Sequence, residues 1–478
     1  MSTEGGLTEL GVAAAAAAIH DGAITSESYT DALLDQARGN SELHSFITID
    51  EPAVLAAAAA ADKARAAGST APLLGVPLGV KDSYLTRGLR TTLGVRTLDT
   101  FVPDRDAAAV RAVTDAGAIV FGKNNLVELS YGLTGDNARF GQVKNPRAPE
   151  HVPGGSSSGS AAAVAARIVP AAFGGDTVGS IRVPAALTGV VGFKPTTGRW
   201  PGDGVAPISP TLDTTGMLAR SVDDCVLIDR IVVGADRVRP PAPSQLSQVR
   251  FAYAPKQFLD LIEPEIAAGF HETVELLRSH GAAVVEIDLG TDFSALTGRV
   301  AWSLFFGETQ RALSGFLDAN DVPATFDQLY DELKPQLKQV WSQFVLPSGA
   351  GHLSAAELDK TLTVDRVELQ RRLDKAFGAG GFDALVFPTV AAFAPLIDEQ
   401  WNFTVAGAQV DHLFLAKNTL PASAAGLPGI SIPLGSGRSG LPFGIELDGP
   451  RGDDRVLLAV ARLVEDVLAR HSPARRRV

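Results

Sequence analysis

Short apolar segments alternate with amphipathic stretches along most of this chain. The segment AAVRAVTDAGAIVFGKNN predicts a helix, a turn at Gly117 and a buried strand over residues 118–122, because helical spacing of its apolar positions gives way to a continuous apolar run. The segment TVELLRSHGAAVVEIDL repeats this order, with the turn at Gly281 and the strand over residues 282–287. The segments VRFAYAP and FDALVFPTV predict two further buried strands. This order of elements predicts an α/β fold in which helices cover the faces of a sheet.

Helical patterns dominate two other parts of the chain. Alanine-rich stretches over residues 12–19 and 54–67 predict N-terminal helices. Residues from about 292 to 377 are mostly helical in pattern, and we expect their aromatic side chains in the core or along a pocket wall. The proline-rich, polar stretch over residues 237–248 predicts a surface connection. We therefore expect a single domain over residues 1–478, with N-terminal helices (1–70), a core (about 71–235) and a C-terminal half with a helical insertion (about 249–478).

The composition is that of a globular protein and excludes several classes of function. Hydrophobic residues make up 45% of the chain and charged residues 20%, so a large core can form. The net charge of −12 argues against binding along a phosphate backbone, and the sequence predicts no nucleic acid partner. No apolar run approaches the roughly 18 residues of a membrane helix, and the N-terminus lacks the basic residues of a secretory signal. With one cysteine, Cys225, the sequence predicts a cytoplasmic protein without an internal disulfide, and a homodimer is compatible with it.

Residues 122–201 are rich in Gly, Ser, Thr and Asn, yet they keep helix-like and strand-like segments that a flexible linker would lack. Serines concentrate here in PGGSSSGSAAAVAA and GGDTVGSIRVP, and the lysine of GVPLGVKD precedes them. A serine hydroxyl attacks an amide only when a base lies within hydrogen-bond reach. The eight histidines are scattered, and only His151 lies just ahead of a glycine-rich turn. Together, the lysine Lys81, the serine cluster of Ser156, Ser157 and Ser158, and the serine Ser180 offer a nucleophile, a proton relay and a base without any histidine.

Other hydrolytic sites fit the sequence less well. The GSSSG run that begins at Gly155 matches the G-x-S-x-G elbow, but the prolines of NPRAPEHVPG exclude the strand that must precede such an elbow. The S-x-x-K motif is absent, because no lysine has a serine three positions before it. Two adjacent aspartates disfavour a thiolate at Cys225. The segment HETVE at His271 lacks the second histidine of a zinc motif, and the sequence predicts no metal and no cofactor.

The chain resembles the amidase signature family. GVPLGVKD matches the segment with that family's catalytic lysine, GGSSSGSAAAVAA matches its Gly/Ser-rich motif, and GSIRVPAALTGVVGFKPTTGRWP matches the stretch that follows its nucleophile. The resemblance is densest over residues 75–221 and extends more loosely to residues 425–435 and 440–450. It implies the amidase signature fold, which is a large mixed, twisted β-sheet covered by helices on both faces.

The resemblance also implies a role for each member of the set. Ser180 would be the nucleophile, Ser156 the bridging serine that follows a cis peptide bond, and Lys81 the base. A lysine at its ordinary pKa of about 10.4 is charged near neutral pH and cannot accept a proton. Because burial lowers the pKa of a lysine, we expect Lys81 to lie in a dry site and to be largely unprotonated in the competent enzyme. We expect the neighbouring Asp82 to bind backbone amides or another partner, since an inward carboxylate would oppose this shift.

An oxyanion site is expected in the segment DTVGS, from the amides of Thr177, Val178, Gly179 and Ser180. The family usually has glycine where this chain has Val178. Because a β-branched residue resists positive φ, we expect an ordinary backbone at Val178 and an unusual one only at Gly179. The valine side chain would then narrow or redirect the acyl pocket. Matching family positions imply that Ser157 and Arg182 support the site, and pairing of Arg182 with Asp176 is an equal alternative for that arginine.

The phrase GFKPTTGRWPGDGVAPISPTLDTTGMLARSVDD is similar to indoleacetamide hydrolases and mandelamide hydrolases, which cleave primary amides with an aromatic acyl part. We therefore expect a small aryl or arylalkyl amide as substrate. Carbamate (urethane), anilide and ester hydrolysis stay open as alternatives, because the relay does not dictate the leaving group. An inactive binding protein and a glutamyl-tRNA amidotransferase A-type subunit fit less well, since the chain keeps all three relay residues and is acidic. The candidate pocket residues are Leu126, Trp302, Phe305 and Phe306.

Overall fold

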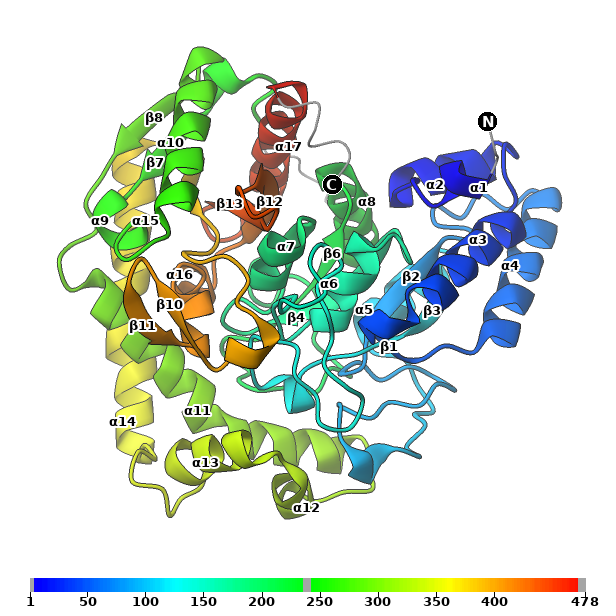
Figure 1. The fold of residues 1–478 in the computed structure, drawn as a ribbon, viewed down its shortest axis with the longest axis horizontal. Coiled ribbons are helices and arrows are strands. Elements are labelled where there is room, and N and C mark those ends of the chain that lie inside the picture. Colours follow the sequence, from blue (N-terminus) through cyan, green and yellow to red (C-terminus); the bar gives the residue numbers. More distant parts are fainter. Residues whose placement is uncertain (1–3, 235–241, 472–478) are drawn as a thin grey trace.

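A mixed sheet of eleven strands forms the centre of the protein (Figure 1). The computed structural model describes residues 4–234 and 242–471. The strands of this sheet are β1 (Phe46–Thr48), β2 (Pro77–Lys81), β3 (Ile119–Asn124), β4 (Ala171–Asp176), β5 (Val191–Lys194), β6 (Thr214–Ala219), β7 (Arg250–Tyr253), β8 (Ala283–Glu286), β9 (Ala384–Pro388), β12 (Gly429–Ser436) and β13 (Pro442–Asp448). They follow the order β1-β3-β2-β4-β6-β5-β12-β13-β9-β7-β8. Strand β2 runs parallel to β3 and β4, and β7 runs parallel to β8 and β9, while the other neighbouring pairs are antiparallel.

Helices account for most of the remaining chain, and a separate hairpin is formed by β10 (Asn402–Val405) and β11 (Ala408–Asp411). The α-helices are α1 (Glu4–Leu7), α2 (Val12–His20), α3 (Ser26–Gly39), α4 (Glu51–Ala66), α5 (Ala108–Asp115), α6 (Ser158–Ala165), α7 (Arg182–Thr188), α8 (Val222–Val233), α9 (Pro255–Phe258), α10 (Pro264–Ser279), α11 (Phe293–Ala319), α12 (Phe326–Glu332), α13 (Pro335–Phe344), α14 (Ala355–Lys360), α15 (Arg366–Gly380), α16 (Leu420–Ala425) and α17 (Asp454–His471). Within residues 4–234 and 242–471, none of these helices combines the length and the apolar character needed to cross a bilayer.

Apolar side chains alternate between the two faces of the sheet along β9. Ala384 and Val386 belong to one buried apolar cluster, whereas Leu385 and Phe387 belong to a second. Because successive side chains of a strand point to opposite faces, the two clusters lie on opposite sides of the sheet. Helices α2, α3, α5, α8 and α17 contribute to the first cluster, and α7, α11, α13, α15 and α16 contribute to the second. The predicted α/β fold with helices on both faces is therefore confirmed.

Most of the predicted elements are present at the predicted places. The two segments with helix, glycine and strand form α5 with β3 and α10 with β8, and both Gly117 and Gly281 have positive φ in the turns. VRFAYAP and FDALVFPTV form the buried parts of β7 and β9. Residues 237–241 of the predicted connection lie outside the described residues, and Leu246–Gln248 form a short 3-10 helix.

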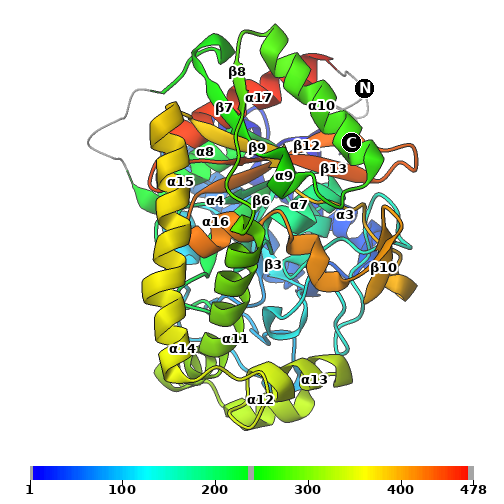
Figure 2. The same ribbon diagram turned by 90° about the vertical axis from the view of Figure 1, so that its left-hand side faces the viewer.

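The helical insertion extends from one end of the sheet, where α11, α12 and α13 lie together and α14 and α15 form a long column (Figures 1 and 2). Aromatic rings join this insertion to the loop that follows β3. The ring of Tyr131 lies 4.6 Å from that of Phe305 on α11 and 5.1 Å from that of Trp341 on α13, measured between centroids. The Tyr131 hydroxyl also makes a 3.0 Å hydrogen bond with Thr309. The insertion is thereby fixed over one side of the site described next.

The parallel pairing of β2 with β4 brings two of the candidate segments together. Lys81 is the last residue of β2, and Asp176 is the last residue of β4. Because parallel strands end at the same edge of a sheet, the segments that follow them meet there. The turn that contains Ser180 directly follows β4, so Ser180 lies at the edge where β2 ends.

Candidate active site

Lys81 is almost completely buried at the end of β2. A hydrogen bond of 2.8 Å joins its Nζ to Ser156 Oγ. Burial lowers the pKa of the Lys81 amine to about 7, against the opposing effect of the Asp213 and Asp176 carboxylates. Roughly half of this amine is then neutral at pH 7, whereas an ordinary lysine is fully charged. The predicted burial of Lys81 is therefore present.

Asp82, the neighbour of Lys81, is bound by other groups. Its Oδ2 accepts hydrogen bonds from the amide and the hydroxyl of Thr92, at 2.8 and 2.5 Å. Lys123 Nζ lies 3.2 Å from Asp82 Oδ1, and both side chains are fully buried. Asp82 thus binds a backbone amide and a second lysine, as the sequence predicted. Lys81 is left with a serine hydroxyl, rather than a carboxylate, as its hydrogen-bond partner.

Ser156 lies in the loop that leads into α6, and the peptide bond between Gly155 and Ser156 is cis. The next residue, Ser157, fixes this loop against two other segments of the site. Its Oγ accepts a hydrogen bond from the amide of Gly175 in β4 at 3.2 Å, and its own amide donates to the Ser180 carbonyl at 3.3 Å. Ser157 therefore joins the serine loop to β4 and to the segment of Ser180.

Ser180 lies in the turn between β4 and α7, where one glycine has an unusual conformation. Val178 avoids positive φ, whereas Gly179 has a φ of 138°, as the sequence predicted. A Cβ on Gly179 would lie 2.2 Å from Thr419 Oγ1, so packing as well as backbone conformation requires glycine here. Among the described residues, none accepts a hydrogen bond from the amides of Val178, Gly179 or Ser180. These donors are available for an anion, and the Thr177 amide is adjacent to them.

Arg182 forms a buried ion network directly after this turn. Its Nε and Nη2 donate to the two oxygens of Asp176 at 3.0 Å each, and its Nη1 donates to Glu446 Oε1 at 2.9 Å. Both carboxylates are fully buried. Although burial opposes ionisation, the Arg182 guanidinium holds the pKa of Asp176 below its ordinary value. Arg182 therefore makes the ion pair with Asp176 that was one of its two predicted roles, and it joins the end of β4 to β13.

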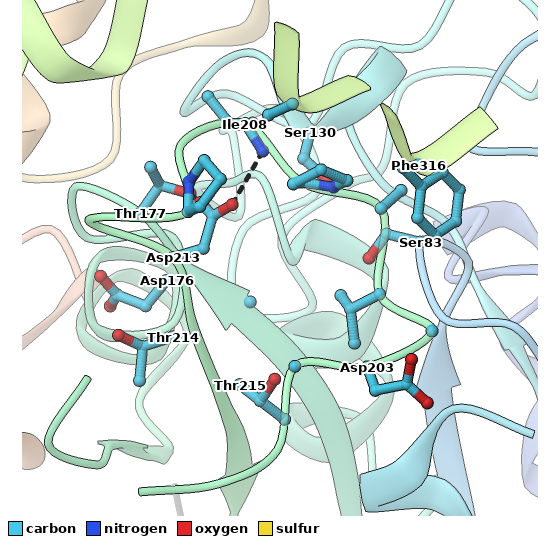
Figure 3. Close-up of a pocket in the computed structure, with 18 of the residues that line it drawn as sticks. Ser83, Ser130, Asp176, Thr177, Asp203, Ile208, Asp213, Thr214, Thr215 and Phe316 are labelled. Atoms are coloured by element: carbon cyan, nitrogen blue, oxygen red, sulfur yellow. Dashed lines mark hydrogen bonds between the residues drawn. The ribbon is translucent and has the colours of Figure 1, made fainter. Parts of the chain in front are cut away.

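Two adjoining cavities reach the serines and the lysine. The smaller, of about 30 Å³, contains Ser180 in a wall that is otherwise mostly apolar. The larger, of about 450 Å³, is lined by Lys81 and Ser156 together with many polar groups. In Figure 3 its walls carry Thr177 and Asp213 on one side and Ser83 and Phe316 on the other. Of the residues that the structure describes, Ser130 is the one that lines both of these cavities.

Asp213 is a buried carboxyl of the larger cavity that the sequence did not single out. The Thr177 hydroxyl donates to its Oδ1 at 2.7 Å, and the Ser209 amide donates to its Oδ2 at 3.0 Å. The Ile208 amide also donates to Oδ2, at 2.9 Å (Figure 3). Burial raises the pKa of Asp213 to about 7, although these hydrogen bonds act in the opposite direction. Asp213 and Lys81 thus titrate in one pH range and influence each other. No local sequence motif predicts that Asp213 influences Lys81, because the two residues come together only when β2 and β6 lie in one sheet.

The smaller cavity contains three of the four predicted pocket residues, Trp302, Phe305 and Phe306. The expectation for Leu126 is not met, because its side chain is fully buried against the turn at Gly94 and lines neither cavity. An apolar residue that is close to the site in the sequence can lie in the core or in a pocket wall. Its position in the sequence does not show which of these two places it occupies. His412 and Leu413 also line the smaller cavity, and the sequence did not predict them because they come from a distant segment.

Comparisons with known proteins agree with this geometry. A family model described as Amidase matches residues 28–458. Mandelamide hydrolase of Pseudomonas putida is 36% identical over 97% of this chain and 92% of that protein. Indoleacetamide hydrolase of Allorhizobium ampelinum is 34% identical over 83% of this chain and 85% of that protein. A glutamyl-tRNA(Gln) amidotransferase A-type subunit from a Roseiflexus species is 34% identical over 98% of both chains.

A solved structure agrees as well. A crystal structure of an amidase superposes with a TM-score of 0.83 at 28% identity, covering 96% of this chain and 99% of the other. The match thus extends over almost the whole of both chains. The chain therefore belongs to the amidase signature family of amidohydrolases.

Proposed function

We propose that this amidase hydrolyses a small aryl or arylalkyl amide to an acid plus ammonia or an amine, with Ser180 as nucleophile, Ser156 as proton relay and Lys81 as base. The observation that carries the proposal is the buried 2.8 Å hydrogen bond between Lys81 Nζ and Ser156 Oγ. A buried lysine whose pKa is near 7 and whose partner is a hydroxyl can accept a proton from that hydroxyl. The proposal requires no histidine and no metal ion.

The reaction proceeds through an acyl-enzyme. Ser180 Oγ attacks the carbonyl carbon while its proton passes to Ser156 Oγ, and the Ser156 proton passes to Lys81 Nζ. The protons return along the same path to the nitrogen as the bond between carbon and nitrogen breaks, so the amine leaves neutral. Water then attacks the ester of Ser180 with the same relay, which releases the acid and restores the free serine.

The first link of this relay is formed in the structure, while the second link is not. Lys81 is hydrogen bonded to Ser156, whereas the hydroxyls of Ser156 and Ser180 are not hydrogen bonded to each other. Catalytic hydrogen bonds are often long without substrate and shorten in the reacting complex. We infer that the second link forms when a carbonyl carbon occupies the space beside Ser180 and its oxygen accepts hydrogen bonds from the amides of the DTVGS turn.

The apolar cavity around Ser180 supports an aromatic acyl group. Its walls include the rings of Trp302, Phe305 and Phe306, which a flat ring can contact at offset or edge-to-face geometry. Two of the relatives are named for amides with aromatic acyl groups, mandelamide and indoleacetamide. Carbamates, anilides and esters stay as alternative substrates of the same site. An amidotransferase role is a second candidate, since an A-type subunit is also a relative.

A substrate panel tests the proposal. Phenylacetamide, indole-3-acetamide, mandelamide, an acetanilide, an aryl ester and an ethyl carbamate are incubated with the purified chain, and the acid and amine products are quantified. Hydroxylamine is then added, and the ratio of hydroxamate to acid is measured for an ester and an amide with one acyl group. A common acyl-enzyme gives the same ratio for both. Glutamine hydrolysis without turnover of any aryl substrate would favour the amidotransferase role instead.

The pH dependence of hydrolysis should report the Lys81 amine. We expect kcat/KM to rise about tenfold per pH unit below a midpoint near 7 and to level above it, because only the neutral amine accepts a proton. Asp213→Asn should move this midpoint to lower pH, since the Asp213 carboxylate raises the pKa of Lys81. Asp203→Asn is the matched control, because Asp203 lines the same cavity but is bound by Arg105. A midpoint that rises in Asp213→Asn would contradict this assignment.

Substitution of Val178 should change the preference among substrates more than the hydrolysis rate of the smallest amide. Its side chain lines the apolar cavity beside Ser180. We expect Val178→Gly to change kcat/KM for arylalkyl amides of different acyl size by roughly 10-fold relative to one another, as one or two methyl groups do in a hydrophobic pocket. Acetamide, the smallest substrate, should change least. Equal changes for acetamide and for all larger amides would mean that Val178 acts on the backbone of the turn and not on the pocket.

A further inference from the structure

The two hydroxyls of the proposed relay open into different cavities. Ser180 lines the apolar cavity of about 30 Å³, and Ser156 lines the polar cavity of about 450 Å³. Ser130 lines both cavities, and both hydroxyls act on one molecule in the proposed reaction, so we place that molecule between the two cavities. The two cavities differ in size and polarity, so each would bind a different part of one substrate.

The proposed reaction assigns each part, and this step rests on that proposed function. The acyl carbon becomes bonded to Ser180 Oγ, so the acyl group lies on the side of the apolar cavity. The leaving nitrogen receives its proton from Ser156, so the nitrogen and its substituents lie on the side of the polar cavity. We propose that the polar cavity is the leaving-group site and that it binds an amine larger than ammonia with hydrogen-bonding substituents. The preferred substrates would then be N-substituted amides with a polar aliphatic amine.

The volume of the polar cavity exceeds what ammonia requires. A molecule of the size of water takes up roughly 30 Å³ in a liquid. The polar cavity of about 450 Å³ is more than ten times larger and lies in the range of sites that bind whole small molecules. The apolar cavity, in contrast, is small, and mostly apolar and aromatic side chains line it around Ser180. Most of the space beside the relay is thus on the side of the leaving group.

The walls of the polar cavity carry hydrogen-bonding groups with free capacity. Ser83 is almost fully buried, and its hydroxyl has no hydrogen-bond partner among the described residues. Asp213 accepts three hydrogen bonds within the chain, and its carboxylate oxygens have room for more. Phe316 lies across the cavity from Asp213 and supplies an apolar wall for the carbon chain of an amine (Figure 3). An amine with hydroxyl groups matches these walls better than an alkyl amine.

One face of α11 closes this cavity. Ala312 and Phe316 on α11, and Asn320 directly after its end, line the cavity at a spacing of four residues. The small side chain at 312 leaves space that a larger one would fill. On the same helix, Ala319 is exposed and does not line the cavity. Ala312→Phe would therefore fill part of the cavity, and Ala319→Phe is the matched control that adds the same ring outside it.

The experiment compares three substrates with one acyl group, phenylacetamide, N-(2,3-dihydroxypropyl)phenylacetamide and N-pentylphenylacetamide. The last two have leaving groups with the same number of non-hydrogen atoms. We expect kcat/KM for the dihydroxypropyl amide to exceed that for the pentyl amide by roughly tenfold, because the pentyl chain leaves the polar wall groups without partners. Ser83→Ala should reduce this ratio. Ala312→Phe should lower kcat/KM for the dihydroxypropyl amide by roughly tenfold more than for phenylacetamide, whereas Ala319→Phe should keep the ratio of wild type.

Each contrary result overturns the proposal in a recognisable way. Hydrolysis of phenylacetamide without hydrolysis of either substituted amide would overturn the leaving-group site and leave the proposed function intact. An equal loss for all three substrates in Ala312→Phe, with unchanged thermal unfolding, would show that the cavity serves water supply or packing. Absence of hydrolysis for every amide, carbamate and ester tested would remove the proposed function itself.

Discussion

Ser180→Ala should reduce amide hydrolysis by about a million-fold, to the background rate, as loss of a serine nucleophile does in other hydrolases. The hydroxyl at 180 is the only group of the proposed relay that forms a bond to substrate, so no neighbouring group replaces it. Lys81→Ala should cause a loss of similar size, because without the neutral amine the proton of Ser156 has no acceptor. The measurement is kcat/KM for an arylalkyl amide, with the free acid quantified over hours.

A double variant at Ser180 and Lys81 distinguishes a shared proton relay from two independent contributions to the rate of hydrolysis. Residues that act as one unit are strongly non-additive, so Ser180→Ala with Lys81→Ala should be no slower than either single variant. Ser160→Ala is the matched control in the serine-rich segment, because its buried hydroxyl donates to the Phe173 carbonyl at 2.8 Å and has no place in the relay. It should keep near-normal turnover. If Ser180→Ala keeps a substantial part of the activity while its thermal unfolding is unchanged, the assignment of the nucleophile is wrong.

Two buried lysines on neighbouring strands differ in their partners, and only one of them is the proposed base. Lys123 on β3 lies 3.2 Å from the Asp82 carboxylate, and it also donates to the Tyr84 carbonyl and the Thr91 hydroxyl. Lys81 on β2 has a hydroxyl partner and no carboxylate within ion-pair distance among the described residues. Because Asp82 is bound on the Lys123 side, the residue adjacent to the proposed base does not stabilise its charged form. In the proposed mechanism, the pair of Asp82 and Lys123 would thus favour the neutral form of Lys81 without touching substrate.

The sequence predicted the elements of the fold better than their order in space. Helix, glycine and strand follow from local spacing and from the turn at Gly117, so α5 and β3 were identified correctly. The position of β12 next to β5 depends on packing between residues far apart in the chain, and no local pattern shows it. In the candidate site, too, contacts between residues far apart in the chain could not be predicted from local patterns. Lys81, Ser156 and Ser180 were selected through the family resemblance, whereas Asp213 and His412 are near them only because of the folded sheet and the C-terminal segments.

Arg182 is the position where a single substitution should cost most stability. Its guanidinium is fully buried and binds the carboxylates of Asp176 and Glu446 as well as the Ser423 hydroxyl at 2.9 Å. Arg182→Met keeps much of the side-chain volume but leaves two buried carboxylates without a counter-charge. Removing one partner of a buried ion pair typically costs about 3–5 kcal/mol. We therefore expect the free energy of unfolding to fall by about 3–5 kcal/mol, measured by urea denaturation.

The pH dependence and matched variants identify the cause of that loss. Without the guanidinium, burial should raise the folded-state pKa of Asp176 above its unfolded value, so the loss should be larger at pH 8 than at pH 5. Adding Glu446→Gln should restore part of the stability, because it removes one uncompensated charge. Arg38→Met, which breaks an exposed ion pair with Glu51, should have a much smaller effect. If Arg182→Met and Arg38→Met unfold at the same urea concentration at both pH values, the network around Asp176 does not hold the end of β4, and the position of Ser180 must depend on the packing of Gly179 against Thr419 instead.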